Sequence, residues 1–291
     1  MASIKDIRER AVLVQFKDRI WAASKLDQEV SASVAAQNKA KNSKVGFYKK
    51  HLIPRTALKG RLRVSNQTRA YHYRNTLPWM DDGMRILPAK NLASYMRQMR
   101  EYKKQAEEAD KEFFANYNEY VKSAKEVLGK MFRREEYPPL EEVRAKFSFD
   151  IVVLPIPEVK DWRVDIGQKE MDALRKEAMG SIMELQQEAV MDLWRRLYEV
   201  VNKVQERLEK DDNVFRDSLI ENVKKMLEVL PSLNITDDPE LTKMAKEIDQ
   251  KLTKTSPDVL RGDSAARRKT AKEAATITKK MDVFMKRGAR K

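Results

Sequence analysis

The chain has 291 residues, of which 59 are Lys or Arg and 45 are Asp or Glu, so its net charge is +14. It contains no Cys and only two His, which excludes disulfides, thiolate nucleophiles and zinc fingers and argues against a His-based catalytic centre. Charged residues make up 36% of the chain, whereas Gly and Pro number only 8 and 10, a composition that favours long helices. We therefore expect a mainly α protein that is not an enzyme and uses no cofactor or metal.

The first predicted domain covers residues 1–90 and is helical. Residues 3–36 are predicted to form one helix, because apolar side chains recur there at helical spacing. A basic helix is expected over residues 57–75. The turn-rich loop that follows contains Trp79, which either anchors a binding partner or fills the core.

The second predicted domain, residues 91–210, contains the strongest helical signals. Apolar stripes run through residues 91–132 and 168–210, each about 40 residues long and free of Pro. Between them, residues 147–166 alternate and are rich in β-branched side chains, which predicts a small β-hairpin. The expected result is an elongated protein with a long antiparallel, coiled-coil-like helix pair and this one hairpin.

The C-terminal third is predicted to be a short helical bundle, residues 211–262, followed by a basic helix or tail, residues 263–291. Asp238 before Pro239 is the sequence of a helix N-cap followed by Pro in the first turn. Residues 261–291 hold 11 Lys or Arg against three acidic residues. Such a tail is expected to add attraction to polyanions without sequence preference.

Residues 30–80 contain no Asp or Glu at all, although they hold 11 Lys or Arg and both histidines. Phe, Tyr and Trp are interleaved with these cations. Cations neutralise phosphates and aromatic rings stack on unpaired bases, so this pattern predicts a nucleic-acid surface. The alternative is that the segment packs against the acidic remainder of the same chain or of a partner.

The predicted contacts are the cations and aromatic residues of the acid-free segment, together with the basic cluster near the C-terminus. They are Lys49, Lys50, Arg55, Lys59, Arg61, Arg63, Arg69, Tyr71, His72, Tyr73, Arg74, Trp79, Arg267, Arg268 and Lys269. We expect DNA rather than RNA as the ligand, with low sequence specificity and no membrane partner, and the sequence is compatible with an oligomer. No stretch reaches the length of a membrane span and the N-terminus lacks the order of a secretion signal.

Two other functions are compatible with the sequence. The long helices and the Trp79 loop also suit a protein-interaction module, either an adaptor for an ATPase or an inhibitor of a host enzyme. A metal-dependent nuclease needs several converging carboxylates, for which only Asp81, Asp82, Asp150, Asp161 and Asp165 are candidates. Nucleotide-binding glycine loops and hydrolase motifs do not occur in the sequence.

Several short motifs follow one another in a characteristic order. They are WAASKLD at 21–27, YHYRNTLPW at 71–79, RILP at 85–88, FSF at 147–149, PIP at 155–157, LWRRL at 193–197 and FRDSL at 215–219. Over residues 10–252 the chain resembles an uncharacterised protein family of tailed bacteriophages and prophages, a domain of unknown function. The resemblance implies a phage-encoded protein acting in the cytoplasm of the bacterial host, near phage DNA-metabolism or AAA+ ATPase genes. It implies no catalytic residues.

Overall fold

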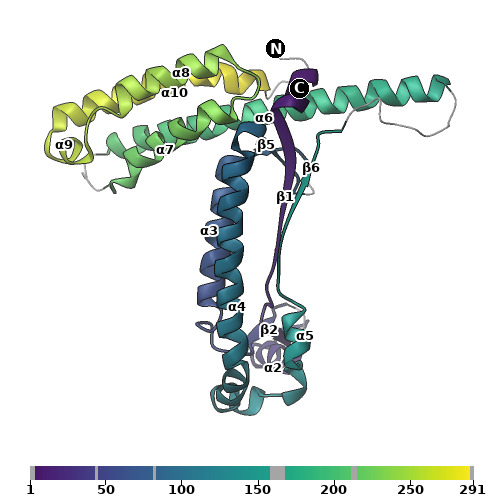
Figure 1. Cartoon of the computed structure of the whole chain (residues 1–291). Coiled ribbons are helices and arrows are strands. Elements are labelled where there is room, and N and C mark those ends of the chain that lie inside the picture. The colour runs from purple at the N-terminus through teal and green to yellow at the C-terminus, as the bar shows by residue number, and fades with distance from the viewer. Residues whose placement is uncertain (1–3, 43–44, 81–82, 158–167, 211–214, 289–291) are drawn as a thin grey trace. The chain divides into compact units, whose positions relative to one another are not determined.

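The computed structural model describes all residues except 1–3, 43–44, 81–82, 158–167, 211–214 and 289–291 (Figure 1). The fold is mainly α, as expected from the composition. The chain divides into two compact units. Unit 1 comprises residues 1–15, 72–95 and 152–291, and unit 2 comprises residues 16–71 and 96–151.

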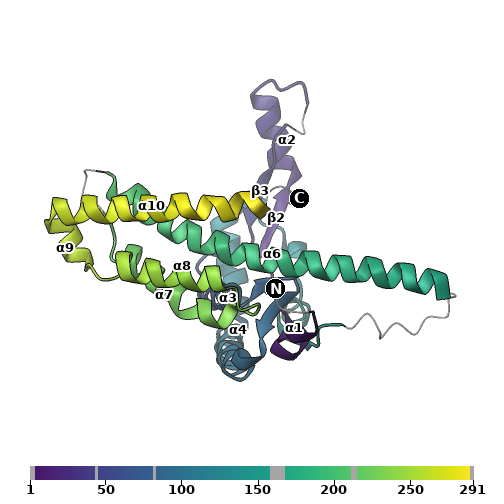
Figure 2. The same ribbon diagram turned by 90° about the horizontal axis from the view of Figure 1, so that it is seen from above.

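Unit 1 is a helical layer built on one long helix. Its helices are α1 (Ile4–Arg10), η1 (Ala89–Asn91), α6 (Gln168–Leu208), α7 (Ser218–Leu233), α8 (Pro239–Leu252), α9 (Pro257–Gly262) and α10 (Ser264–Gly288). Helices α7 and α10 pack on α6, and α8 packs on both α7 and α10 (Figure 2). Across the described residues, no helix combines the length and the apolar character that crossing a bilayer requires.

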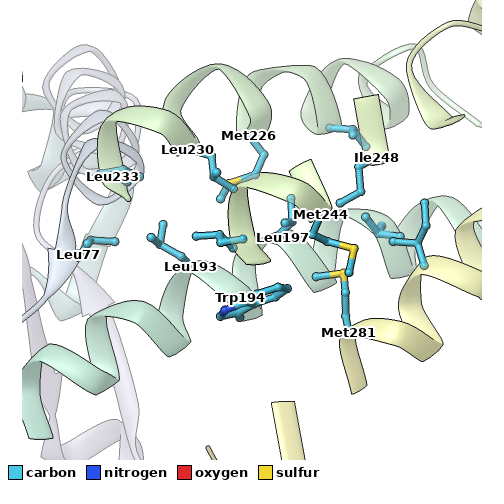
Figure 3. Packing of buried hydrophobic residues seen from close by; sticks show 14 of the residues in the cluster. Leu77, Leu193, Trp194, Leu197, Met226, Leu230, Leu233, Met244, Ile248 and Met281 are labelled. Carbon is cyan, nitrogen blue, oxygen red and sulfur yellow. The ribbon is translucent and has the colours of Figure 1, made fainter. Parts of the chain in front are cut away.

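The core of unit 1 lies where these helices face one another (Figure 3). Leu193 and Leu197 of α6 meet Leu230 of α7 and Ile248 of α8, and all four side chains are at most 1% exposed. Trp194 stacks on Phe284 with a centroid distance of 4.3 Å. This burial of apolar surface is the main force holding the layer together.

The helix start predicted from the sequence at Asp238 and Pro239 is confirmed as the start of α8. The carboxylate of Asp238 accepts from the backbone N–H groups of Glu240 and Leu241, and Pro239 follows in the first turn. These bonds satisfy donors that the first turn of a helix leaves unpaired. The pair Ser256 and Pro257 forms the same arrangement at α9.

Of the two structures predicted for the basic C-terminal segment, a helix or a tail, the helix is confirmed, and it packs within unit 1. Ala274, Ile277 and Met281 of α10 are fully buried against the bundle. Most of the Lys and Arg side chains of α10 lie on its exposed faces, whereas Arg267 is buried. The sequence domains 211–262 and 263–291 are therefore parts of one structural unit together with α6.

A four-stranded sheet has the order β4 (Leu77–Pro78), β5 (Arg85–Pro88), β1 (Ala11–Arg19), β6 (Ser148–Leu154). Strand β1 pairs antiparallel with β5, placing Ala11 opposite Pro88 and Val14 opposite Arg85. The single helix predicted over residues 3–36 is thus wrong at its centre. The β-branched run at the start of β1 also satisfies strand propensity, and tertiary pairing with β5 decides between the two structures.

The strand predicted after residue 147 is confirmed as β6, but its neighbour in the sheet is β1. The second half of the expected hairpin, residues 162–166, lies outside the described residues. A seven-residue strand alone does not specify its partner, because any exposed strand edge offers the same backbone groups.

Unit 2 is built on two long antiparallel helices, to which shorter helices and a two-stranded ribbon are added. Its elements are β2 (Ser24–Asp27), α2 (Gln28–Gln37), β3 (Tyr48–His51), α3 (Lys59–Asn75), α4 (Leu92–Leu128), η2 (Gly129–Met131), η3 (Arg134–Glu136) and α5 (Leu140–Arg144), of which α3 and α4 extend into unit 1. Arg61 contacts Asp110 and Tyr71 contacts Tyr102, so α3 runs antiparallel to α4 (Figure 1).

The two long helices predicted as one pair are α4 and α6, and each packs with other helices of its own unit. In unit 2, α4 lies along α3, whereas in unit 1, α6 packs on α7 and α10. An apolar stripe at 3.6-residue spacing shows that a helix buries one face, but it does not identify the element that covers that face. The domain boundaries at residues 90 and 210 likewise differ from those of the two units.

Candidate nucleic-acid interface

Arg61, the most buried cation of the acid-free segment, is neutralised by carboxylates from outside it. Its side chain is 1% exposed; Nη2 donates to Oδ1 of Asp18 at 2.6 Å and Nε to Oδ1 of Asp110 at 2.9 Å. Ser65 also donates to Asp18. Burial raises the pKa of Asp110, and the nearby Arg61 opposes that shift. Arg61 is therefore a structural ion pair, and its prediction as a phosphate contact is corrected.

Lys50 is buried in the same way. Its ammonium lies 3.0 Å from Asp27 and 2.9 Å from Glu136, and it donates to the carbonyl of Met131 at 2.7 Å. Burial alone would lower the pKa of Lys50, but the contacts with Glu136 and Asp27 raise it above its usual value. The pKa of Asp27 is lowered by the N–H of Val30 and by Lys50. Lys50 is thus removed from the predicted contacts, because its charge is already compensated.

His72, a predicted contact in unit 1, is 3% exposed. Its Nδ1 lies 2.6 Å from the hydroxyl of Tyr95, which is itself fully buried. Burial, assisted by the charge of Arg85, lowers the pKa of His72 to about 4. The imidazole is neutral at pH 7, so it offers no charge to a phosphate and no accessible ring to a base.

Two further predicted contacts in unit 1 are buried. Trp79 is 2% exposed and belongs to the core, so the core alternative for this residue is confirmed. Arg267 is 5% exposed and donates to the carbonyl of Leu260, which ties the start of α10 to α9. Neither side chain can reach a ligand without unfolding its surroundings. Asp81 and Asp82, next to the Trp79 loop, lie outside the described residues.

The two predicted tyrosines already have partners. The ring of Tyr71 is half-buried against Tyr102, with a centroid distance of 5.8 Å. Tyr73 is 53% exposed, but the guanidinium of Arg85 lies 4.6 Å from its centroid. A cation over a ring occupies the face on which a base would stack. Neither tyrosine is therefore a preformed base platform.

The remaining predicted cations are exposed. In unit 2 these are Lys49, Arg55, Lys59, Arg63 and Arg69, and in unit 1 they are Arg74, Arg268 and Lys269. Lys59 and Arg63 are one turn apart on the outer face of α3, a helix whose sequence contains no carboxylate. The positive charges of Lys59 and Arg63 on this face take no part in the buried ion pairs of Arg61 and Lys50.

A groove of about 610 Å³ in unit 2 adjoins this face and brings three exposed cations together. Arg69 comes from α3, Arg19 from the end of β1 and Lys146 from the residues after α5. The carboxylate of Asp18 also lines the groove, but Arg61 holds it at 2.6 Å and Arg69 lies 3.9 Å away. The groove therefore carries a net positive charge and suits an anionic ligand.

Arg19 and Lys146 were missed by the sequence analysis, because both lie outside residues 30–80. Nε of Arg19 donates to Ser148 at 3.3 Å, which holds the guanidinium beside the groove. A strand prediction for residues 11–19 would have indicated a cation at a strand end, but it would not have brought Lys146 near it. Only the fold of unit 2 brings the three segments together.

A second basic groove, of about 410 Å³, lies between α8 and α10 of unit 1. It is lined by Lys251, Arg268, Lys269 and Lys272, with Glu273 as the acidic residue among them. Arg268 and Lys269 are therefore placed on a rigid helix, where their charges add to an electropositive surface. The described residues contain no group of three or more His, Asp or Glu suited to hold a metal ion.

Comparisons with protein-family models, with curated proteins and with solved structures give no match for this chain.

Proposed function

We propose that the chain is a non-enzymatic, phage-encoded protein that binds nucleic acid, DNA rather than RNA, with low sequence specificity in the cytoplasm of the bacterial host. The observation that carries the proposal is the groove of unit 2, where Arg19, Arg69 and Lys146 converge beside the acid-free face of α3. Such a surface contacts phosphates through charge, which is independent of base sequence. It therefore suits a protein that supports phage DNA metabolism.

The test is a fluorescence anisotropy titration of a labelled DNA duplex at graded salt. Wild-type affinity should fall steeply as salt rises, since phosphate contacts release counterions. Replacing Arg19, Arg69 and Lys146 with Ala should reduce the slope of log affinity against log salt by about 0.9 for each phosphate that is no longer neutralised. Absence of binding at low salt would refute the proposal.

The matched control removes the same number of charges from exposed positions away from the groove. It replaces Lys111, Lys125 and Lys130, all exposed residues of unit 2, with Ala. If the groove is the binding site, this control should bind as the wild type does apart from a small uniform decrease in affinity. An equal decrease in both triple variants would show that net charge, and not the groove, attracts the DNA.

A second candidate function is a protein-interaction module, an adaptor for a phage ATPase or an inhibitor of a host enzyme. Met179 and Met183 of α6 favour it, because they lie one turn apart and are 48% and 49% exposed. Flexible, polarisable methionine side chains suit adaptable protein surfaces. A stoichiometric partner that co-purifies without nucleic acid would support this function. A metal-dependent nuclease would instead cleave DNA when Mg²⁺ or Mn²⁺ is added.

A further inference from the structure

The ribbon formed by β2 and β3 in unit 2 has one open face. The strands pair antiparallel, with Leu26 opposite Lys49 and Ser24 opposite His51. Because side chains alternate along a strand, these four residues share a face. Leu26 is 42% exposed, and Lys49 and His51 are also exposed. The other face contains the buried pair Asp27 and Lys50 together with the exposed residues Lys25 and Tyr48. The face that carries Leu26, Lys49 and His51 is therefore the more open of the two.

Contacts on the other face hold the ribbon in place. Lys50 joins Asp27 to Glu136, which follows α4 in the chain. The backbone N–H of Tyr48 donates to the hydroxyl of Ser31 at 2.9 Å, and that hydroxyl donates to the carbonyl of Asp27. A ligand of the open face would therefore meet a preformed surface and spend little binding energy on ordering it.

An exposed aromatic residue, Phe47, lies directly before β3 and two positions from Lys49. Its side chain is 70% exposed, so the ring can be reached from solvent. Among the described residues, the ion pairs join other cations to carboxylates and do not include Lys49, and the nearby carboxylate of Asp27 is already paired with Lys50. An apolar protein partner would need only Phe47 and Leu26, whereas a ring beside an uncompensated cation matches a base and its phosphate together.

We propose that this face binds unpaired bases of single-stranded nucleic acid, with Phe47 stacking on a base while Lys49 contacts the adjoining phosphate. The inference rests on the proposed function and adds to it a preference for single strands. In a duplex the bases are stacked on one another, so their faces are closed to Phe47.

The test compares three labelled ligands of equal length: an oligothymidylate, a blunt duplex, and an abasic deoxyribose-phosphate strand that carries charge without bases. Phe47→Ala should lower affinity for oligothymidylate by roughly five- to 150-fold, the factor that removal of one base stack gives. Its affinities for the duplex and for the abasic strand should equal those of the wild type. Phe47→Trp should keep the affinity for oligothymidylate, since Trp also stacks.

The control variant is Val127→Ala, an exposed apolar residue of α4 at 78% exposure, which should change none of the three affinities. Salt-dependent binding that Phe47→Ala leaves unchanged on all three ligands would overturn the stacking inference and leave the proposed function standing. An equal decrease on all three ligands would also overturn it. Absence of wild-type binding to every ligand would overturn both proposals.

Discussion

Replacing Arg61 with Met should destabilise the protein strongly without removing a ligand contact. The substitution leaves Asp110, with a side chain 16% exposed, without its counter-ion, and leaves Asp18, with a side chain 1% exposed, with only Arg69 at 3.9 Å. Breaking a buried ion pair by removing one partner costs about 3–5 kcal/mol. Arg63, two residues along the same helix, is exposed, so Arg63→Ala should change the free energy of unfolding by less than about 0.5 kcal/mol.

Urea unfolding followed by far-ultraviolet circular dichroism measures both variants. A triple variant that also converts Asp18 and Asp110 to Leu should recover most of the stability, because replacing a buried ionic group as a set by apolar residues of similar volume is close to neutral. The effects on DNA affinity at low salt should have the opposite order. Arg63→Ala, which removes an exposed cation, should lower the affinity for DNA more than a folded Arg61 variant does. The reasoning is refuted if Arg61→Met unfolds at the wild-type urea concentration.

Three further predictions concern other buried groups. The pKa of His72 is about 4 in the folded protein and 6.5 in the unfolded chain, so the contribution of its neutral form to stability is complete above pH 6.5 and is lost as the pH falls toward 4. Between these two pH values the free energy of unfolding of the wild type should fall by up to about 3 kcal/mol. The free energy of unfolding of His72→Gln should fall by less over the same range. Deleting residues 264–288 should unfold unit 1, because α10 supplies part of its core. The helical circular dichroism signal should then fall by more than the deleted helix alone contributes. A decrease that matches only the deleted helix would mean that unit 1 does not need α10. Lys50→Met should lower the free energy of unfolding by about 3–5 kcal/mol, whereas Lys49→Ala should lower it by less than about 0.5 kcal/mol. Equal urea midpoints for these two variants would contradict the buried role of Lys50.

Much of the helical structure could be predicted from the sequence, because its signals are local. The stripes of α4 and α6 and the caps at Asp238 and Ser256 depend on residues within a few positions of one another. Strand β1 could not be separated from a helix in this way, because its partner β5 is more than seventy residues away in the sequence. Its true structure depends on a hydrogen-bonding partner that no local pattern reveals.

The candidate site was predicted only in part. Of the cations that the acid-free segment indicated, Lys59, Arg63 and Arg69 keep their side chains exposed. Counting charges along the sequence could not show that Arg61 and Lys50 are buried. Their burial depends on the fold, and the carboxylates that pair with them lie in other parts of the sequence. Composition also could not place Arg19 in the groove.

The sequence by itself determined how the charge is distributed: a net charge of +14, an acid-free stretch from residue 30 to 80 and a basic C-terminus. The tertiary structure decided which of those charges remain available. Asp18 and Asp110 lie 43 and 49 positions from Arg61, and only the packing of α3 against its neighbours brings them within hydrogen-bond distance. The physical reason is that a charge can be neutralised by any carboxylate near it in space, and distance along the chain does not fix distance in the fold.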